Sequence, residues 1–86
     1  SRVNKTLTGT VQVTNGSASV VYNDTTDNPK VMPGDAVFFG GSKTGYQVDT
    51  TSGTGFTMTA VYTGSTNASI SCDVRPHSGA LVDIFF

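Results

Sequence analysis

The chain has 86 residues, a formal net charge of −1, one cysteine and one histidine. This length makes a single domain, and a domain so small buries only roughly 60–65% of the surface that its unfolded chain exposes. The single cysteine excludes an internal disulfide, and one cysteine with one histidine excludes a structural zinc site. We therefore expect association with other chains to supply part of the stability.

The charge and the residue types narrow the possible partners and the fold class. A net charge of −1 gives no electrostatic reason to expect nucleic acid or an anionic membrane as a partner. No apolar run approaches the ~20 residues that a bilayer-spanning helix needs. All six acids are aspartate, and threonine, serine, glycine and valine are abundant. Because β-branched and turn-forming residues replace helix formers, the composition predicts an all-β chain.

The chain begins with a polar arm, residues 1–7, which carries the two cations Arg2 and Lys5. We expect this arm to be extended and weakly held unless a neighbour binds it. Alternating apolar residues then predict a first strand over Thr8–Thr14 and a second over Ser17–Tyr22. Together they form a hairpin with one buried face.

Turn residues separate the next elements. Asn15-Gly16 predicts a type I′ hairpin turn, in which both central residues have positive φ. The segment Asn23–Pro33 is rich in Asp, Asn, Thr and Pro and predicts a long loop. A tight turn at Pro33–Asp35 leads into a strand over Ala36–Gly40, which is apolar on both faces and is therefore expected to be central or covered.

The rest of the chain continues the pattern of short strands and glycine-rich turns. We expect strands over Tyr46–Thr50, Phe56–Tyr62, Ala68–Val74 and Ala80–Phe86. About six to seven short strands, separated by turns, predict a small antiparallel β-barrel or sandwich of the SH3-like kind. The expected organisation is an arm (residues 1–7), a β domain (8–75) and an apolar strand or tail (76–86).

The final strand, Ala80–Phe86, is apolar on both faces apart from Asp83. A terminal strand that is left in water in this form would template aggregation. Two interpretations stay open: the segment closes its own barrel as a buried strand, or it docks on another subunit.

Catalytic chemistry finds little support in the residue types. His77 is the single imidazole and stands in a Pro/Ser/Gly turn, and Cys72 is in phase with the inward residues of its strand. Turn capping accounts for the aspartates, and Asn23–Asn28 lacks the spacing of a calcium loop. We therefore predict a non-enzyme without catalytic, cofactor-binding or metal-binding residues.

Five aromatic residues admit two interpretations. They could form an exposed platform for sugar or single-stranded nucleic acid. They could equally pack in the core, because each fits the inward phase of its strand. The five residues are Tyr22, Phe38, Phe39, Tyr46 and Tyr62.

Four segments, taken together and in this order, resemble the motifs of a known kind of module: Val13–Val21, Val31–Phe39, Tyr46–Val48 and Phe56–Gly64. They resemble a small β module of tailed-bacteriophage virion proteins, over about Val11–Ser71. The chain departs from that pattern in the longer loop before Val31 and in the tail after Val74.

The resemblance implies a virion structural protein, made in the host bacterial cytoplasm, without catalytic residues. We expect a capsid decoration (cement) protein that binds other virion proteins, the major capsid protein first, and copies of itself. Nucleic acid, membrane and small-molecule substrates are not expected partners. The alternatives are a tail or neck adaptor, a fibre-attachment protein, or a host-surface carbohydrate-binding module. The predicted interface residues are Arg2, Lys5, Arg75, Leu81, Ile84, Phe85 and Phe86.

Overall fold

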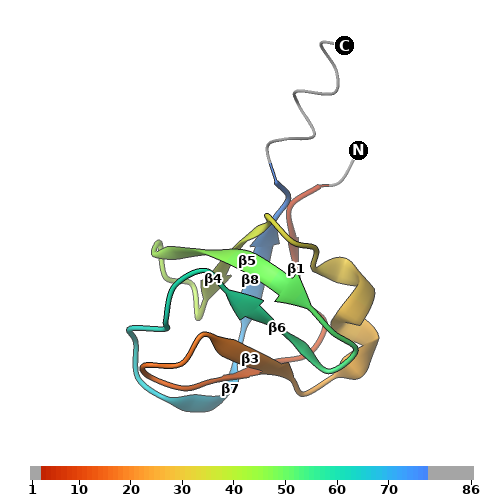
Figure 1. Ribbon diagram of the computed structural model, residues 1–86. Coiled ribbons are helices and arrows are strands. Elements are labelled where there is room, and N and C mark those ends of the chain that lie inside the picture. Colours follow the sequence, from red (N-terminus) through yellow and green to blue (C-terminus); the bar gives the residue numbers. More distant parts are fainter. Residues whose placement is uncertain (1–2, 78–86) are drawn as a thin grey trace.

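The computed structural model describes residues 3–77 of the chain. Within this range the chain forms short strands and a single 3-10 helix, η1 (Thr25–Lys30), and no α-helix (Figure 1). The all-β prediction is therefore confirmed. The strands are β1 (Lys5–Thr6), β2 (Val11–Val13), β3 (Ser19–Tyr22), β4 (Ala36–Phe39), β5 (Gly45–Thr51), β6 (Gly55–Met58), β7 (Asn67–Ile70) and β8 (Cys72–Arg75).

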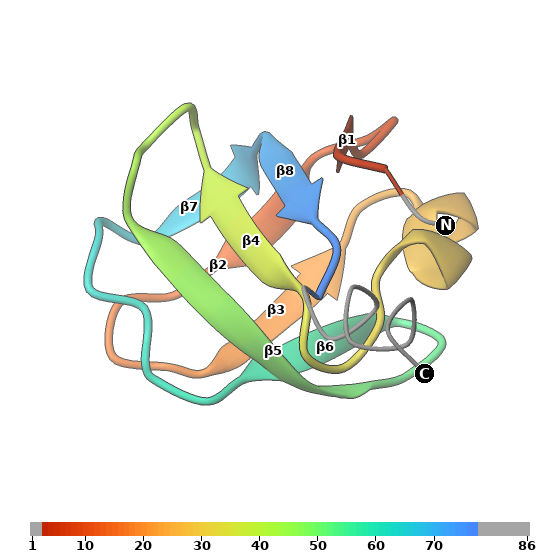
Figure 2. The ribbon, with the colours of Figure 1, turned by 90° about the horizontal axis from the view of Figure 1, so that it is seen from above.

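These strands form one antiparallel sheet in the order β1-β8-β4-β5-β6-β3-β2-β7. The longest strand, β5, joins the two halves of the sheet: residues 45–47 pair with β4, and residues 48–51 pair with β6 across a register shift. Seen from above, the strands curl round a common interior (Figure 2). The end strands β1 and β7 do not pair with each other, so the sheet is open. The closed barrel of the prediction is not confirmed.

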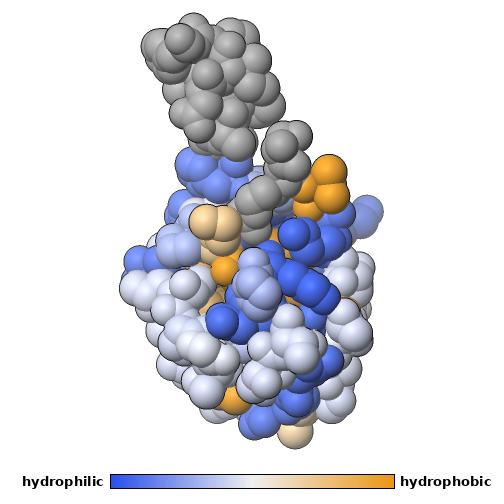
Figure 3. Space-filling view, turned by 90° about the vertical axis from the view of Figure 1, so that its right-hand side faces the viewer, coloured by the Kyte–Doolittle hydropathy of each residue, from blue (hydrophilic) through white to orange (hydrophobic). Residues whose placement is uncertain are grey.

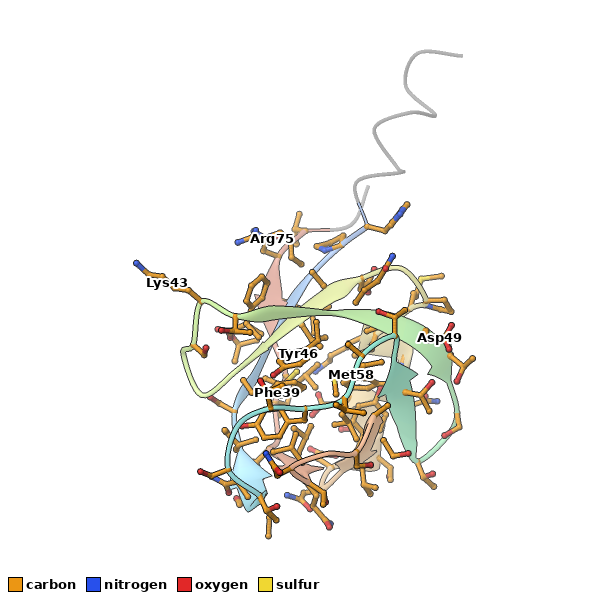
Figure 4. The ribbon with its side chains drawn as sticks, turned by 60° about the vertical axis from the view of Figure 1, so that its left-hand side comes forward. Phe39, Lys43, Tyr46, Asp49, Met58 and Arg75 are labelled. Carbon is orange, nitrogen blue, oxygen red and sulfur yellow. The ribbon has the colours of Figure 1, made fainter. Side chains whose placement is uncertain are left out.

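One hydrophobic core fills the inner side of the curved sheet. Alternation along β2 and β4 points every second residue inward, so β2 buries Val11 and Val13, and β4 buries Val37 and Phe39. Burial of each such side chain contributes about 1.5–3 kcal/mol. Figure 4 shows two labelled aromatic core residues and Met58 in this interior. The other core members are Leu7, Val20, Tyr22, Val31, Tyr46, Val48, Phe56, Met58, Tyr62, Cys72 and Val74.

The first hairpin turn differs from the type I′ prediction. Ser17 N donates to the Thr14 carbonyl at 3.0 Å, and Gly16 has φ 80°, but Asn15 does not have positive φ. This is the pattern of a type II turn, which needs positive φ at its third residue alone. The Asn15 side chain instead donates to the Gly64 carbonyl at 2.9 Å. The turn is therefore shaped by a distant loop that packs against it.

The Pro33–Asp35 turn is confirmed. Asp35 N donates to the Met32 carbonyl at 3.1 Å, and Gly34 has φ 90°, so Pro33 and Gly34 take the two central places of a type II turn. The strand that follows, β4, is central as predicted, because it pairs with β5 on one side and β8 on the other.

Further segments differ from the predicted elements. Residues 5–7 belong to the sheet rather than to a loose arm: β1 pairs with β8, and Leu7 is buried. The predicted loop Asn23–Pro33 contains η1, whose first turn is capped by the Asp24 side chain. The predicted strand Ala68–Val74 is divided at Ser71 into β7, which pairs with β2, and β8, which pairs with β4 and β1.

The strand predicted over Phe56–Tyr62 ends at Met58. Ala60, which the alternation places inward, is exposed, while Tyr62 is buried. The last predicted strand, Ala80–Phe86, lies outside the described residues.

Candidate functional site

A groove of about 670 Å³ lies over β1, β8 and β4 and the turn between β4 and β5. Three positively charged residues help to line it: Lys5, Lys43 and Arg75. Figure 4 shows Lys43 and Arg75 in the upper part of the molecule, outside the core. Most of the groove is therefore built on the face of the sheet that points away from the core.

A row of paired residues crosses four strands on this outer face. Thr6 on β1 pairs with Asp73, Asp73 pairs with Phe38, and Phe38 pairs with Gly45 on β5. Residues that stand opposite each other in an antiparallel sheet point to the same side. Thr6 Oγ1 donates to Asp73 Oδ1 at 2.6 Å, which holds that carboxylate in place.

The Phe38 ring lies across Gly45. A Cβ atom at Gly45 would stand only 2.8 Å from Phe38 Cε2, so any larger residue at this position would displace the ring. The ring also contacts Arg75, whose guanidinium carbon lies 4.9 Å from the centroid of the Phe38 ring. This is a cation–π contact, worth about 0.5–1 kcal/mol at an exposed site. Phe38 remains half-buried rather than enclosed in the core.

The groove concentrates positive charge in a chain of negative net charge. Of the four cations in the described residues, three line the groove, and the fourth, Lys30, pairs with Asp27. Asp73 is the one carboxylate among the groove residues. On the outer face the charges of Lys43 and Arg75 exceed that of Asp73 by one, and Lys5, which stands opposite Val74 on the end strand, raises the excess among all lining residues to two. The net charge of the whole chain is −1.

Both ends of the described chain leave the fold beside this groove. β1 and β8 run antiparallel with Lys5 opposite Val74, so residues 3–4 and residues 75–77 lie at the same end of the sheet (Figure 1). Lys5 and Arg75, predicted as interface residues, are thereby brought together. The other predicted interface residues, Arg2, Leu81, Ile84, Phe85 and Phe86, lie outside the described residues.

Sequence reasoning considered Phe38 only as one member of a possible aromatic platform, and it did not assign Lys43 to any binding surface. Phe38 stands on the half-buried phase of β4, opposite to its core neighbour Phe39, and this alternation was the available signal. Lys43 lies in a turn, and no local pattern indicates that the turn folds over the outer face of the sheet.

The proposed sugar platform is a set of core residues, except for Phe38. Tyr22, Phe39, Tyr46 and Tyr62 are all buried. Phe39, Tyr46 and Tyr62 pack against one another with ring centroids 5.5–5.7 Å apart. Tyr46 keeps its hydroxyl satisfied, since that oxygen accepts from Thr63 N at 3.1 Å. The core interpretation of these residues is therefore confirmed.

Asp27 is a buried acid whose carboxylate accepts from three donors. Its side chain is 1% exposed, and its oxygens accept from Thr8 N at 2.9 Å, Gly9 N at 2.8 Å and Lys30 Nζ at 2.8 Å. Burial by itself raises the pKa of this carboxyl, but the hydrogen bonds from Lys30, Gly9 and Thr8 outweigh burial, and the pKa lies below its ordinary value. This acid therefore joins the start of β2 to η1 and has a structural role.

Cys72, the candidate nucleophile, and His77, the candidate base, do not form a reactive pair. Cys72 is fully buried, and burial, with smaller contributions from Asp73 and Asp27, raises the pKa of its thiol to about 12. A thiol in this state is protonated and unreactive at neutral pH. His77 N donates to Asp35 Oδ1 at 3.1 Å, and the His77 ring packs on Gly34. This histidine therefore lies against the Pro33–Asp35 turn, not beside the cysteine.

Comparisons of the chain with protein-family models, curated proteins and solved structures found no match. Within residues 3–77, no three or more His, Cys, Asp or Glu side chains gather in a way that would hold a metal ion. The same residues include no helix of the length and apolarity that crossing a membrane requires.

Proposed function

We propose that this protein is a structural component of a bacteriophage virion and, more specifically, a capsid decoration protein. Its role is to bind assembled subunits, with the major capsid protein as first partner and copies of itself as second. The support is the resemblance of about Val11–Ser71 to virion β modules, together with the architecture of one end of the fold. The protein would act on the virion after synthesis in the host cytoplasm.

The observation that carries this proposal is that the two ends of the described chain, residues 3–4 and 75–77, lie together at one positively charged groove. Segments that leave a small domain side by side can reach the same neighbour, so the end of the sheet is suited to contacts between subunits. The face in Figure 3 is mostly polar over the described residues, with hydrophobic residues in small separate spots. Such a surface favours binding through a defined region and not through a broad apolar face.

The finer fold class forms part of the same proposal. β5 is shared between two halves of a sheet that curls on itself, which supports a small SH3-like barrel as the nearest architecture.

Copy number in purified particles tests the function. A decoration protein is present in numbers comparable to those of the shell subunit, binds shells that lack it, and does not bind free shell subunits, because it stabilises the assembled form alone. Densitometry and a sedimentation assay with intact particles measure both properties. A few copies per particle would replace this proposal with a neck or tail adaptor. Absence from particles would reject the virion assignment.

A further inference from the structure

We propose that the groove formed by Lys5, Phe38, Lys43, Asp73 and Arg75 binds an extended, acidic segment of a partner protein. The inference deepens the proposed function, since it names the chemistry of the partner that the groove accepts. It rests on that function only in treating the groove as a contact surface.

Charge complementarity selects an anionic ligand. The lining residues Lys5, Lys43 and Arg75 come from three places in the chain, and only the fold gathers them. Lys43 is exposed and Arg75 projects over the Phe38 ring. An arginine guanidinium binds a carboxylate through two parallel hydrogen bonds, and a lysine adds a point charge beside it.

The centre of the groove favours a peptide over a nucleic-acid strand. Asp73 stands in the middle of the row, held by Thr6 Oγ1 at 2.6 Å. A polyanion with a charge on every unit would place one phosphate against this carboxylate. A peptide can instead place acidic residues on either side, over the cations, and an apolar side chain on Phe38.

The edge of the sheet favours an extended conformation. β1 is an end strand. Leu7 N donates to the Cys72 carbonyl at 3.0 Å, so in the alternating antiparallel pattern the backbone N–H and C=O of Thr6 point away from β8. An extended segment can therefore begin by pairing with Thr6 at the edge of the sheet and continue across the outer face towards Phe38.

The test is a titration of the isotope-labelled full chain, followed by backbone amide NMR. The probe is a short capped peptide in which aspartate alternates with valine around one central phenylalanine. The matched control peptide carries asparagine at each aspartate. We expect shifts at Phe38, Lys43 and Arg75 with the acidic probe, with affinity falling about tenfold or more between about 0.02 M and 0.2 M salt.

Two protein variants locate the binding. Lys43→Gln removes one exposed charge and is expected to weaken binding about two- to fivefold. Ser65→Asp changes the net charge by the same amount at an exposed position that does not line the groove, and is expected to leave affinity within about twofold. Amide spectra of both variants check that the fold is retained.

Several outcomes overturn the inference. They are the absence of shifts at the groove, equal binding of the asparagine peptide, and an equal loss of affinity in Ser65→Asp and Lys43→Gln. Tighter binding of a single-stranded oligothymidylate or of a sulfated oligosaccharide than of the acidic peptide overturns it as well. Because the assay uses no particles, groove binding by a protein that is absent from virions would reject the virion proposal and leave this inference standing.

Discussion

Substitution of the buried carboxylate Asp27 by asparagine tests the main polar link in the fold. The carboxylate receives two backbone N–H groups and one ammonium group. An asparagine can keep its oxygen towards Thr8 N and Lys30 Nζ, but its NH₂ group then faces Gly9 N, and two donors meet. A buried donor without an acceptor costs about 1–3 kcal/mol, and the lost charge on the remaining bonds adds about 1 kcal/mol.

The expected loss for Asp27→Asn is therefore about 2–4 kcal/mol at neutral pH, out of a total of roughly 4–13 kcal/mol for a domain of this length. Urea unfolding followed by circular dichroism measures it. The matched control is Asp24→Asn, because Asp24 caps η1 through an oxygen that accepts from Thr26 N at 3.0 Å. Asparagine caps a helix equally well, so this control should change stability by less than about 0.5 kcal/mol.

The pH dependence supplies a second criterion. The pKa of Asp27 is lowered in the folded state from its ordinary value of 3.8. Its contribution is therefore fully present above about pH 4 and is lost as the pH falls through the folded-state value. The difference between the wild type and Asp27→Asn should shrink in acid. A loss below about 1 kcal/mol at neutral pH, or a difference that does not change in acid, would refute this account of the site.

Three further predictions follow from the core. Tyr22→Phe should stabilise the protein by about 1 kcal/mol in urea unfolding, because the buried Tyr22 hydroxyl has no hydrogen-bond partner within the described residues; destabilisation would show that the hydroxyl is satisfied. Gly55→Ala should lower the free energy of unfolding by about 3 kcal/mol, because a Cβ atom would stand 2.0 Å from the Val20 carbonyl oxygen. Gly53→Ala should leave stability unchanged, because a Cβ atom there would have nothing within 4 Å. Equal thermal midpoints for the two variants would contradict this. Burial raises the pKa of Cys72 from 9.0 to about 12. The contribution of the protonated thiol to the free energy of unfolding is therefore complete below pH 9 and is lost between pH 9 and 12, by about 4 kcal/mol. Cys72→Ala should flatten this alkaline loss of stability in a pH series of unfolding curves.

Alternation in the sequence was sufficient to predict much of the core. Val11 and Val13 are both buried, as expected for residues on one face of a half-buried strand, because the side chains of a strand point alternately to its two faces whatever the strand pairs with. For β4 the alternation predicted that Val37 and Phe39 share a face, but it did not predict which face is the inner one, because both faces are apolar. The Pro33–Asp35 turn was predictable for a similar reason, since proline and glycine restrict or permit φ within the residue itself. These are local properties of the chain.

Local patterns failed where distant segments decide the conformation. The turn at Asn15-Gly16 is type II because it is fixed by hydrogen bonds to a distant loop. Asn15 and Gly16 donate to three acceptors there, on Tyr62, Gly64 and Thr66. The division of the predicted strand Ala68–Val74 at Ser71 likewise follows from its two halves pairing with different parts of the sheet.

The sequence by itself determined an all-β chain, the inward faces of most strands and the lack of a disulfide. Only the tertiary structure decided that Lys5 lies opposite Val74, that Phe38 covers Gly45 beside Arg75, and that Asp27 is buried. The reason is physical: the direction of a side chain is set by its own backbone, whereas strand register and the gathering of charges depend on pairing between residues far apart in the chain.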